Sequence, residues 1–402
     1  MIRKIEIENF MSLRDVSVDL GPLTVFLGPN GSGKSAIFKA LVTLAKLVNG
    51  APVRGFKTGD FTMEPGVTLD SAVWQGNSGL PIKFRVWFED DGDNPGYTLE
   101  LAKGIEGWSV IREKIRAGDG WIEVDEDNEF EHPTERGSPR VYRPPLRATL
   151  RYLVNPFVND SKSRPVIEPI VQFSKRFGQA HRYRPSASDI ASFVSLPTEA
   201  GRKVYVNENG WGLAAEPQAI QGSKREVFEA IENAVRRVFP HVRTIGFKTE
   251  WQGVRLTFMT DRSQDLIPAP QESDGVLLAT FLFWRLYTAG ESVKTVCLEE
   301  PENGLHPLLL AERFEVLKRF ARAEGGLPAV QLMVATHSPE FLRAVHSHPG
   351  SLWREIRLAE FTADGGTSIR GLRDFREAAN LHENYLIEMQ KRWRPIVENW
   401  PE

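Results

Sequence analysis

A glycine-rich segment near the N-terminus has the residue types and spacing of a phosphate-binding loop. Residues 28–35 read Gly-Pro-Asn-Gly-Ser-Gly-Lys-Ser, which fits G-x-x-x-x-G-K-[ST] between an apolar strand pattern and a helical pattern. Glycines let backbone N–H groups wrap around phosphates, and the helix N-terminus adds unsatisfied donors. We therefore expect Lys34 to contact the β and γ phosphates of ATP and Ser35 to bind Mg²⁺. The other predicted phosphate contacts are Asn30, Gly31, Ser32 and Gly33.

Polar residues also follow two later apolar strand patterns. Glu299 and Glu300 come directly after Val296-Cys-Leu298, and His337 follows the apolar run 332–335. Open α/β sheets bind ligands at the carboxyl ends of their strands. Glu299 is therefore a candidate Mg²⁺ ligand, Glu300 a candidate base for the attacking water, and His337 a candidate donor to the γ phosphate. Taken alone, a glutamate pair or a single histidine at a strand end is as well explained by an ordinary polar role.

The elements that must position these residues alternate between strands and helices, which favours an α/β fold with a mixed sheet. Short strands separated by turns over 67–123 predict an added antiparallel β layer. The remaining expected elements are strands at 2–7, 16–20, 23–27, 243–250, 254–260, 295–300 and 329–337, a hairpin within 201–211, and helices at 36–48, 166–177, 223–238, 274–287, 307–320 and 375–393.

A basic, proline-broken stretch interrupts this alternation. Residues 136–184 contain eleven Arg and Lys against one Asp and one Glu, a charge of +9. We therefore expect an N-terminal lobe (1–101), an Arg-rich inserted subdomain (102–221) and a C-terminal lobe (222–402) of one domain. The insertion has two readings. Its arginines and aromatic residues could bind nucleic acid, or they could pair with the acidic turns 89–93 and 123–131 and form a small core.

Composition excludes several classes of protein. A net charge of −3 over 402 residues argues against nucleic-acid binding by bulk charge. One cysteine allows no internal disulfide, and the first residues lack a signal-peptide pattern, so we expect a cytoplasmic protein. No run approaches the ~20 apolar residues of a membrane span, and we expect no membrane association of the chain by itself.

Together these motifs resemble the ATP-binding-cassette (ABC) ATPases of the RecF and SMC type, including the ATPase domain of OLD-like proteins. The resemblance rests on IEIENFMSLRDVSVDLGPLTVFLGPNGSGKS, LEEPENGLHP and VATHSPEFL. It implies that Glu299 binds the metal, that Glu300 is the catalytic base and that His337 is the switch histidine. It implies a D-loop at 301–307 and a signature segment at 271–276, in which Ser273 and Gly275 contact a nucleotide on a second subunit. Asp274 departs from the L-S-G-G-Q form. Gln75 corresponds to the glutamine that completes the Mg²⁺ shell, and Arg54 to an arginine that reaches the nucleotide.

The resemblance implies an ATP hydrolase that works as an ATP-gated homodimer, with larger oligomers left open. It further implies a regulatory ATPase of a bacterial defence or DNA-maintenance system, paired with a separate effector such as a nuclease or toxin. The alternative is an ATPase that acts directly on DNA or RNA through the basic insertion. Only 65 residues follow His337, with no D-x-D pattern, so a Toprim nuclease domain is not expected. The N-K-x-D segment of common GTPases is absent, and a small-molecule kinase or a transporter subunit explains the motifs less well.

Overall fold

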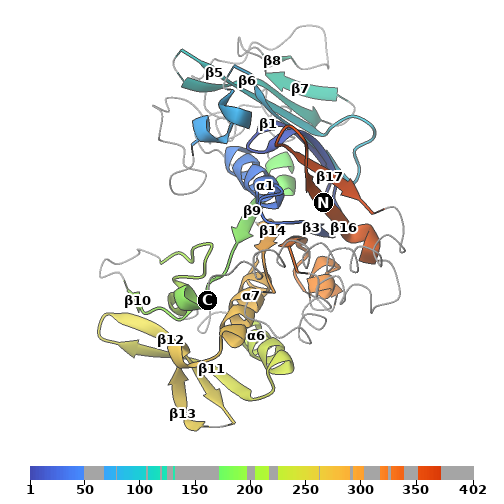
Figure 1. Ribbon diagram of the computed structural model, residues 1–402. Coiled ribbons are helices and arrows are strands. Elements are labelled where there is room, and N and C mark those ends of the chain that lie inside the picture. Colours follow the sequence, from blue (N-terminus) through green and yellow to red (C-terminus); the bar gives the residue numbers. More distant parts are fainter. Residues whose placement is uncertain are drawn as a thin grey trace, which may run out of the picture.

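A computed structural model gives the structure of the chain. It describes residues 1–48, 68–77, 79–105, 107–117, 120–124, 130–131, 172–196, 204–216, 225–261, 263–289, 293–302, 317–324, 327–338 and 352–372. The ribbon in Figure 1 shows an antiparallel sheet at one end and a small sheet with two helices at the other, with the parallel strands between them.

The central sheet has six strands in the order β17-β16-β3-β15-β14-β9. Five of them run parallel, and β17 pairs antiparallel with β16 as a hairpin. Their bounds are β3 Leu23–Leu27, β9 Gln179–Tyr183, β14 Val293–Glu299, β15 Gln331–Thr336, β16 Ile356–Phe361 and β17 Thr367–Gly371. The carboxyl ends of β3, β14 and β15 therefore meet at one edge, as the sequence predicts.

Two helices cover opposite faces of this sheet (Figure 1): α1, Lys34–Val48, and α7, Asp274–Tyr287. Successive side chains of a strand point to opposite faces. Accordingly Cys297 and Met333 belong to the hydrophobic core around α1. Val296 and Leu298 belong to the core around α7. Both faces are apolar, which is why the strands read as continuous hydrophobic runs.

The antiparallel layer has seven strands in the order β2-β1-β4-β5-β6-β7-β8. Their bounds are β1 Ile2–Phe10, β2 Leu13–Asp19, β4 Ile82–Phe88, β5 Tyr97–Gly104, β6 Gly107–Ala117, β7 Gly120–Val124 and β8 Phe130–Glu131. Buried residues of β1, β4 and β5 share one core with α1. The helix that begins at the phosphate loop is thus held between two sheets.

A smaller unit surrounds the far end of α7 (Figure 1). It contains the helix α6, Arg225–Val238, and the strands β10 Val194–Ser195, β11 Val242–Glu250, β12 Gly253–Thr260 and β13 Ser263–Pro268. Phe228 of α6 packs against Trp284 of α7 and Phe247 of β11. None of the helices among the described residues combines the length and apolar character needed to cross a membrane.

The structure differs from the sequence prediction in several places, and the strands β10, β13, β16 and β17 were not predicted. Residues 67–75 were expected as a strand, but the described part forms two short 3₁₀ helices, η1 Asp70–Ala72 and η2 Trp74–Gly76. The expected lobe boundary after residue 101 falls inside β5, and residues 179–183 of the expected insertion form a strand of the central sheet. In the described part of 201–211, residues 204–211 contain a turn and no strand.

Candidate nucleotide-binding site

The glycine-rich loop connects β3 to α1 and has the backbone shape that a phosphate cradle requires. Gly31 and Gly33 have φ angles of 84° and 94°, which non-glycine residues rarely adopt. The amides of Ala36 and Ile37 both donate to the carbonyl of Gly33. The amides of Lys34 and Ser35, at the N-terminus of α1, therefore need partners from outside the helix. A bound phosphate supplies such partners.

Lys34 is buried and lies across this loop. Its Nζ atom donates to the carbonyl oxygens of Gly28 at 2.7 Å and Pro29 at 2.8 Å. Burial lowers the pKa of Lys34, and the nearby carboxylates of Glu300, Glu302 and Glu299 oppose that shift. The acidic residues at and after the end of β14 thus lie within electrostatic reach of the lysine.

The β16–β17 hairpin packs directly on the loop. A Cβ atom at Gly28 would overlap the carbonyl oxygen of Ala359 in β16. One at Gly33 would lie 2.7 Å from Cγ2 of Thr367 in β17 and closer still to its Oγ1. Thr367 is held in place by its amide, which donates to the carbonyl of Ser12 at 2.9 Å. Two of the loop's glycines are therefore needed for close packing, and this was not predicted.

Glu300 and His337 meet at the ends of neighbouring strands. The Nδ1 atom of His337 lies 3.4 Å from Oε1 of Glu300. Glu300 has a φ of 48°, an unusual conformation for this residue type, and its amide donates to the carbonyl of Ala335 at 2.8 Å. This hydrogen bond to β15 holds Glu300 beside the histidine. Backbone strain of this kind is common where a side chain must be aimed at a ligand.

Glu299 is only 5% exposed and has a cationic partner from β9. Nη1 of Arg182 lies 3.2 Å from Oε1 of Glu299, while Nη2 of the same guanidinium lies 2.6 Å from Oε2 of Glu208. Nη2 of Arg184 is 3.7 Å from Oε2 of Glu300. The sequence analysis placed both arginines in the basic insertion, for which nucleic-acid binding and pairing within the protein were both left open. The sequence signal that could have placed Arg182 in a strand is the short pattern of residues 179–183, which is followed by Arg184 and a proline.

The beginning of the expected D-loop, residues 301–302, is also part of the site. Oγ1 of Thr336 donates to Oε1 of Glu302 at 2.5 Å. Burial raises the pKa of Glu302, and the hydrogen bond from Thr336 opposes that shift. Glu302 thus joins the ends of β14 and β15. Residues 303–307 lie outside the described residues.

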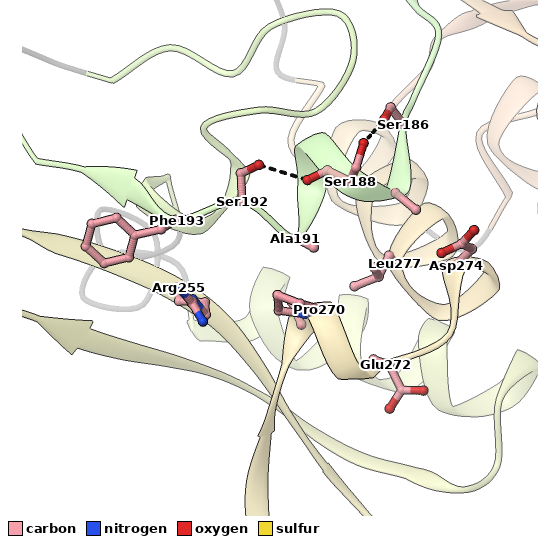
Figure 2. A pocket seen from close by; sticks show the side chains of 12 residues that line it. Ser186, Ser188, Ala191, Ser192, Phe193, Arg255, Pro270, Glu272, Asp274 and Leu277 are labelled. Atoms are coloured by element: carbon pink, nitrogen blue, oxygen red, sulfur yellow. Dashed lines mark hydrogen bonds between the residues drawn. The ribbon is translucent and has the colours of Figure 1, made fainter.

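Ser273, the predicted signature serine, is the exposed N-cap of α7, and Gly275 lies buried in the first turn. The Ser273 side chain makes no capping hydrogen bond, so this hydroxyl is not needed to cap the N-terminus of the helix. A groove of about 650 Å³ lies beside it, between the start of α7 and the short helix α4, Ala187–Ile190. Figure 2 shows Ser188, Ser192, Glu272 and Asp274 around this groove. Its residues are not those of the phosphate loop.

Two weaker predictions concern Gln75 and Arg54. Gln75 does not end a strand. It has a φ of 47°, and its Nε2 atom donates to the carbonyl of Asp364 at 3.0 Å, in the turn of the β16–β17 hairpin. Its role as a metal ligand stays a prediction. Arg54 lies outside the described residues, and its nucleotide contact also stays a prediction.

A magnesium ion fits the chemistry of this edge. Mg²⁺ usually takes one or two protein oxygens and completes its shell with phosphates and water. Ser35 at the start of α1 and the buried carboxylate of Glu299 supply such oxygens. Over the described ranges, no group of three or more His, Cys, Asp and Glu side chains forms a preformed metal site. The oxygens of Ser35 and Glu299 match a metal that takes the rest of its shell from phosphates and water.

In the described part of the basic stretch, several charges and rings have partners within the protein. Arg176 pairs with Asp90 of the acidic turn 89–93, and its guanidinium lies 4.1 Å from the ring centroid of Phe88. Phe173 stacks on Tyr97 with the ring centroids 4.6 Å apart. Of the two readings, these residues support pairing and a small core. Residues 136–171 lie outside the described residues.

Comparisons with known proteins agree with this arrangement. A family model described as "AAA domain, putative AbiEii toxin, Type IV TA system" matches residues 23–343. A protein of Thermus scotoductus described as "OLD nuclease" is 24% identical over 364 residues, 85% of this chain and 60% of that protein. The chain thus spans less than two thirds of that relative's length.

A solved structure of an SMC head shares the fold. An SMC head bound to the C-terminal winged-helix domain of ScpA superposes with a TM-score of 0.51 and 12% identity, covering 94% of this chain and 99% of that one. The SMC head of Thermotoga maritima superposes with a TM-score of 0.42 and 13% identity, covering 93% and 99%. The chain therefore belongs to the AAA-domain family matched over residues 23–343, with the P-loop α/β fold of SMC-like ABC ATPases and a relationship to OLD.

Proposed function

We propose that this chain binds ATP with Mg²⁺ and hydrolyses it to ADP and phosphate. The observation that carries the proposal is the meeting of four predicted residues at one sheet edge. Glu299 and Glu300 act electrostatically on Lys34, and Glu300 lies 3.4 Å from the His337 ring. A phosphate loop, a metal-binding carboxylate, a base and a γ-phosphate donor together form the set that phosphoryl transfer to water needs.

Each residue has a distinct role in this proposal. The loop amides of Gly31 and Gly33 and the Lys34 ammonium hold the phosphates, with Asn30 and Ser32 completing the loop. Ser35 and Glu299 hold Mg²⁺, which neutralises charge that develops on the phosphates. Glu300 accepts the proton of the attacking water. His337 donates a hydrogen bond to the γ phosphate, and its contact with Glu300 orients the base.

The phosphate loop donates from one side only, so a second subunit is needed to enclose the γ phosphate. Ser273 and the free amides at the start of α7 are suited to this because the hydroxyl is exposed and takes no part in capping. Two copies would then form a C₂ homodimer around two nucleotides, each site completed by Ser273 and Gly275 of the partner. Loss of the γ phosphate on hydrolysis removes the bridge and opens the dimer.

The relationship to an OLD nuclease supports a role in which this ATPase regulates an effector, such as a nuclease or toxin in bacterial defence. The chain spans 60% of that relative, so the activity of the whole relative is not transferred. A nucleic-acid target through residues 136–171 is a separate question. In the described part of the basic stretch, Arg176, Arg182 and Arg184 have carboxylate partners within the protein.

Hydrolysis by purified protein tests the proposal. We expect Mg²⁺-dependent phosphate release by the wild type. Glu300→Gln should keep ATP binding and lower the rate by about 10²- to 10⁴-fold, the usual contribution of a general base. Lys34→Met should lose ATP binding. Arg225→Met, which removes an exposed charge on α6, is the matched control and should leave both unchanged. Equal rates in the wild type, Glu300→Gln and Lys34→Met would refute the assignment.

A further inference from the structure

A buried ion pair joins the metal-binding carboxylate to the edge strand of the central sheet. Arg182 pairs with Cys297 in the parallel ladder between β9 and β14, so its side chain lies on the same face as Glu299. The two side chains are 9% and 5% exposed. A buried carboxylate without a cation is costly, and removing one partner of such a pair leaves the other charge uncompensated. In this structure Arg182 supplies the cation that compensates Glu299.

Arg182 has a second carboxylate to hold. Its Nη2 atom lies 2.6 Å from Glu208, which is 34% exposed and belongs to the segment 204–216. The backbone fixes this segment next to β9, because the amide of Arg184 donates to the carbonyl of Glu208 at 3.0 Å. Arginine can bridge two carboxylates through different N–H groups. Arg182 can thus release Glu299 and remain paired with Glu208.

The segment 204–216 also contacts α7. Nε1 of Trp284 in α7 donates to Glu216 at 2.9 Å, and Arg285 pairs with the same carboxylate. Gly210 packs against α7 so closely that a Cβ there would lie 3.1 Å from the Phe281 ring. A continuous set of contacts therefore runs from Glu299 through Arg182 and residues 204–216 to α7, the helix whose N-cap is Ser273.

We propose that Arg182 is a positioning residue that takes the place of the metal at Glu299, and that it releases Glu299 and keeps its contact with Glu208 when Glu299 binds Mg²⁺. This inference rests on the proposed role of Glu299 in the ATPase site. In the metal-free protein Arg182 keeps Glu299 compensated and lowers its affinity for a free divalent cation. A bound nucleotide supplies further oxygens for the metal, so the metal then competes better with Arg182 for Glu299. Metal binding thereby changes the pairing of the segment that packs on α7.

Mn²⁺ binding to the nucleotide-free protein, measured by electron paramagnetic resonance, tests this proposal. Arg182→Met should bind Mn²⁺ about 10- to 100-fold more tightly than the wild type, the range seen when residues around metal ligands are changed. Glu208→Gln should bind it more weakly, because Arg182 then has only Glu299 as a carboxylate partner in this bridge. Arg176→Met removes an equal charge at a pair remote from the site and should have no effect.

Two further measurements keep the result interpretable. If Arg182→Met does not fold, Arg182→Lys retains one charge without the bridge and should bind Mn²⁺ more tightly than the wild type, though less than tenfold. ATP binding by the wild type is measured separately, so failure of the ATPase proposal is distinguished from failure of this one. Unchanged Mn²⁺ affinity in both Arg182 variants, or a shift in the same direction for Glu208→Gln and the Arg182 variants, would overturn the proposal.

Discussion

Replacing Gly33 by alanine tests the packing of the β16–β17 hairpin on the phosphate loop. Two costs add at this position. The φ of 94° disfavours any side chain by about 1–2 kcal/mol. The new Cβ would also overlap Thr367, which is 5% exposed and anchored to Ser12, and such overpacking costs about 1–3 kcal/mol. We expect a total loss of about 2–5 kcal/mol in the free energy of unfolding.

Gly31→Ala is the matched control. Its φ of 84° carries the same backbone cost, but the nearest atom to a new Cβ is Cζ of Phe361 at 3.2 Å, at the far end of a side chain that is 57% exposed. Phe361 can move aside, so we expect a loss of only about 1–2 kcal/mol. The difference between the two glycine variants measures the contacts that a Cβ at Gly33 would make with Thr367 and with Oγ of Ser12.

Thr367→Ala completes a double-mutant cycle, because it removes both Oγ1 and Cγ2. Alone it should cost about 1 kcal/mol for the lost hydrogen bond to Ser12. In that background Gly33→Ala should cost only about 1–2 kcal/mol, which gives a coupling of about 1–3 kcal/mol. Urea denaturation of the four proteins followed by tryptophan fluorescence measures it. Additive losses, or equal losses for the two glycine variants, would refute the packing argument.

Three further predictions concern stability and the second nucleotide contact. Burial, Arg285 and Lys46 lower the pKa of His181 from its usual value near 6.5, so the unfolded chain binds this proton more readily. Stability should therefore fall as the pH drops below 6.5, and His181→Gln should reduce the difference between urea midpoints at pH 7.5 and 5.5. Ser273→Ala should lower the free energy of unfolding by less than the ~1 kcal/mol typical of a capping serine, because the Ser273 side chain makes no capping hydrogen bond. Urea denaturation measures this. Ser273→Arg should leave ATP binding to the monomer unchanged and prevent ATP-dependent dimerisation, measured by titration and by light scattering; a normal dimer would remove Ser273 from the interface.

The sequence was sufficient to predict elements whose signal is local. The phosphate loop, the strand before Glu299 and the helix after Ser273 all combine a short apolar pattern with a nearby turn or cap signal. Strand prediction failed at 67–75 because side chains compete with the sheet there. The amide of Trp74 donates to the side chain of Asn9, and Thr68 and Ser71 bond to each other.

The rest depends on contacts between distant parts of the chain. Thr367 packs against Gly33 although more than three hundred residues separate them in the sequence, and the local pattern of β17 does not predict this contact. Arg182 and Glu299 are 117 positions apart and meet only because β9 and β14 are neighbours in the sheet. Charge counting placed Arg182 with the basic insertion, since a sum over a segment does not show which charges are already paired.

The mass of the Glu300→Gln protein in solution, with ATP and Mg²⁺, tests the central claim most directly. This variant should bind ATP without turning it over, so a dimer that depends on the γ phosphate should accumulate. We expect a dimer with ATP, less dimer with ADP, and no ATP-dependent change in the double variant with Lys34→Met. If ATP neither produces a dimer nor stabilises an existing one, the proposed two-nucleotide switch is contradicted.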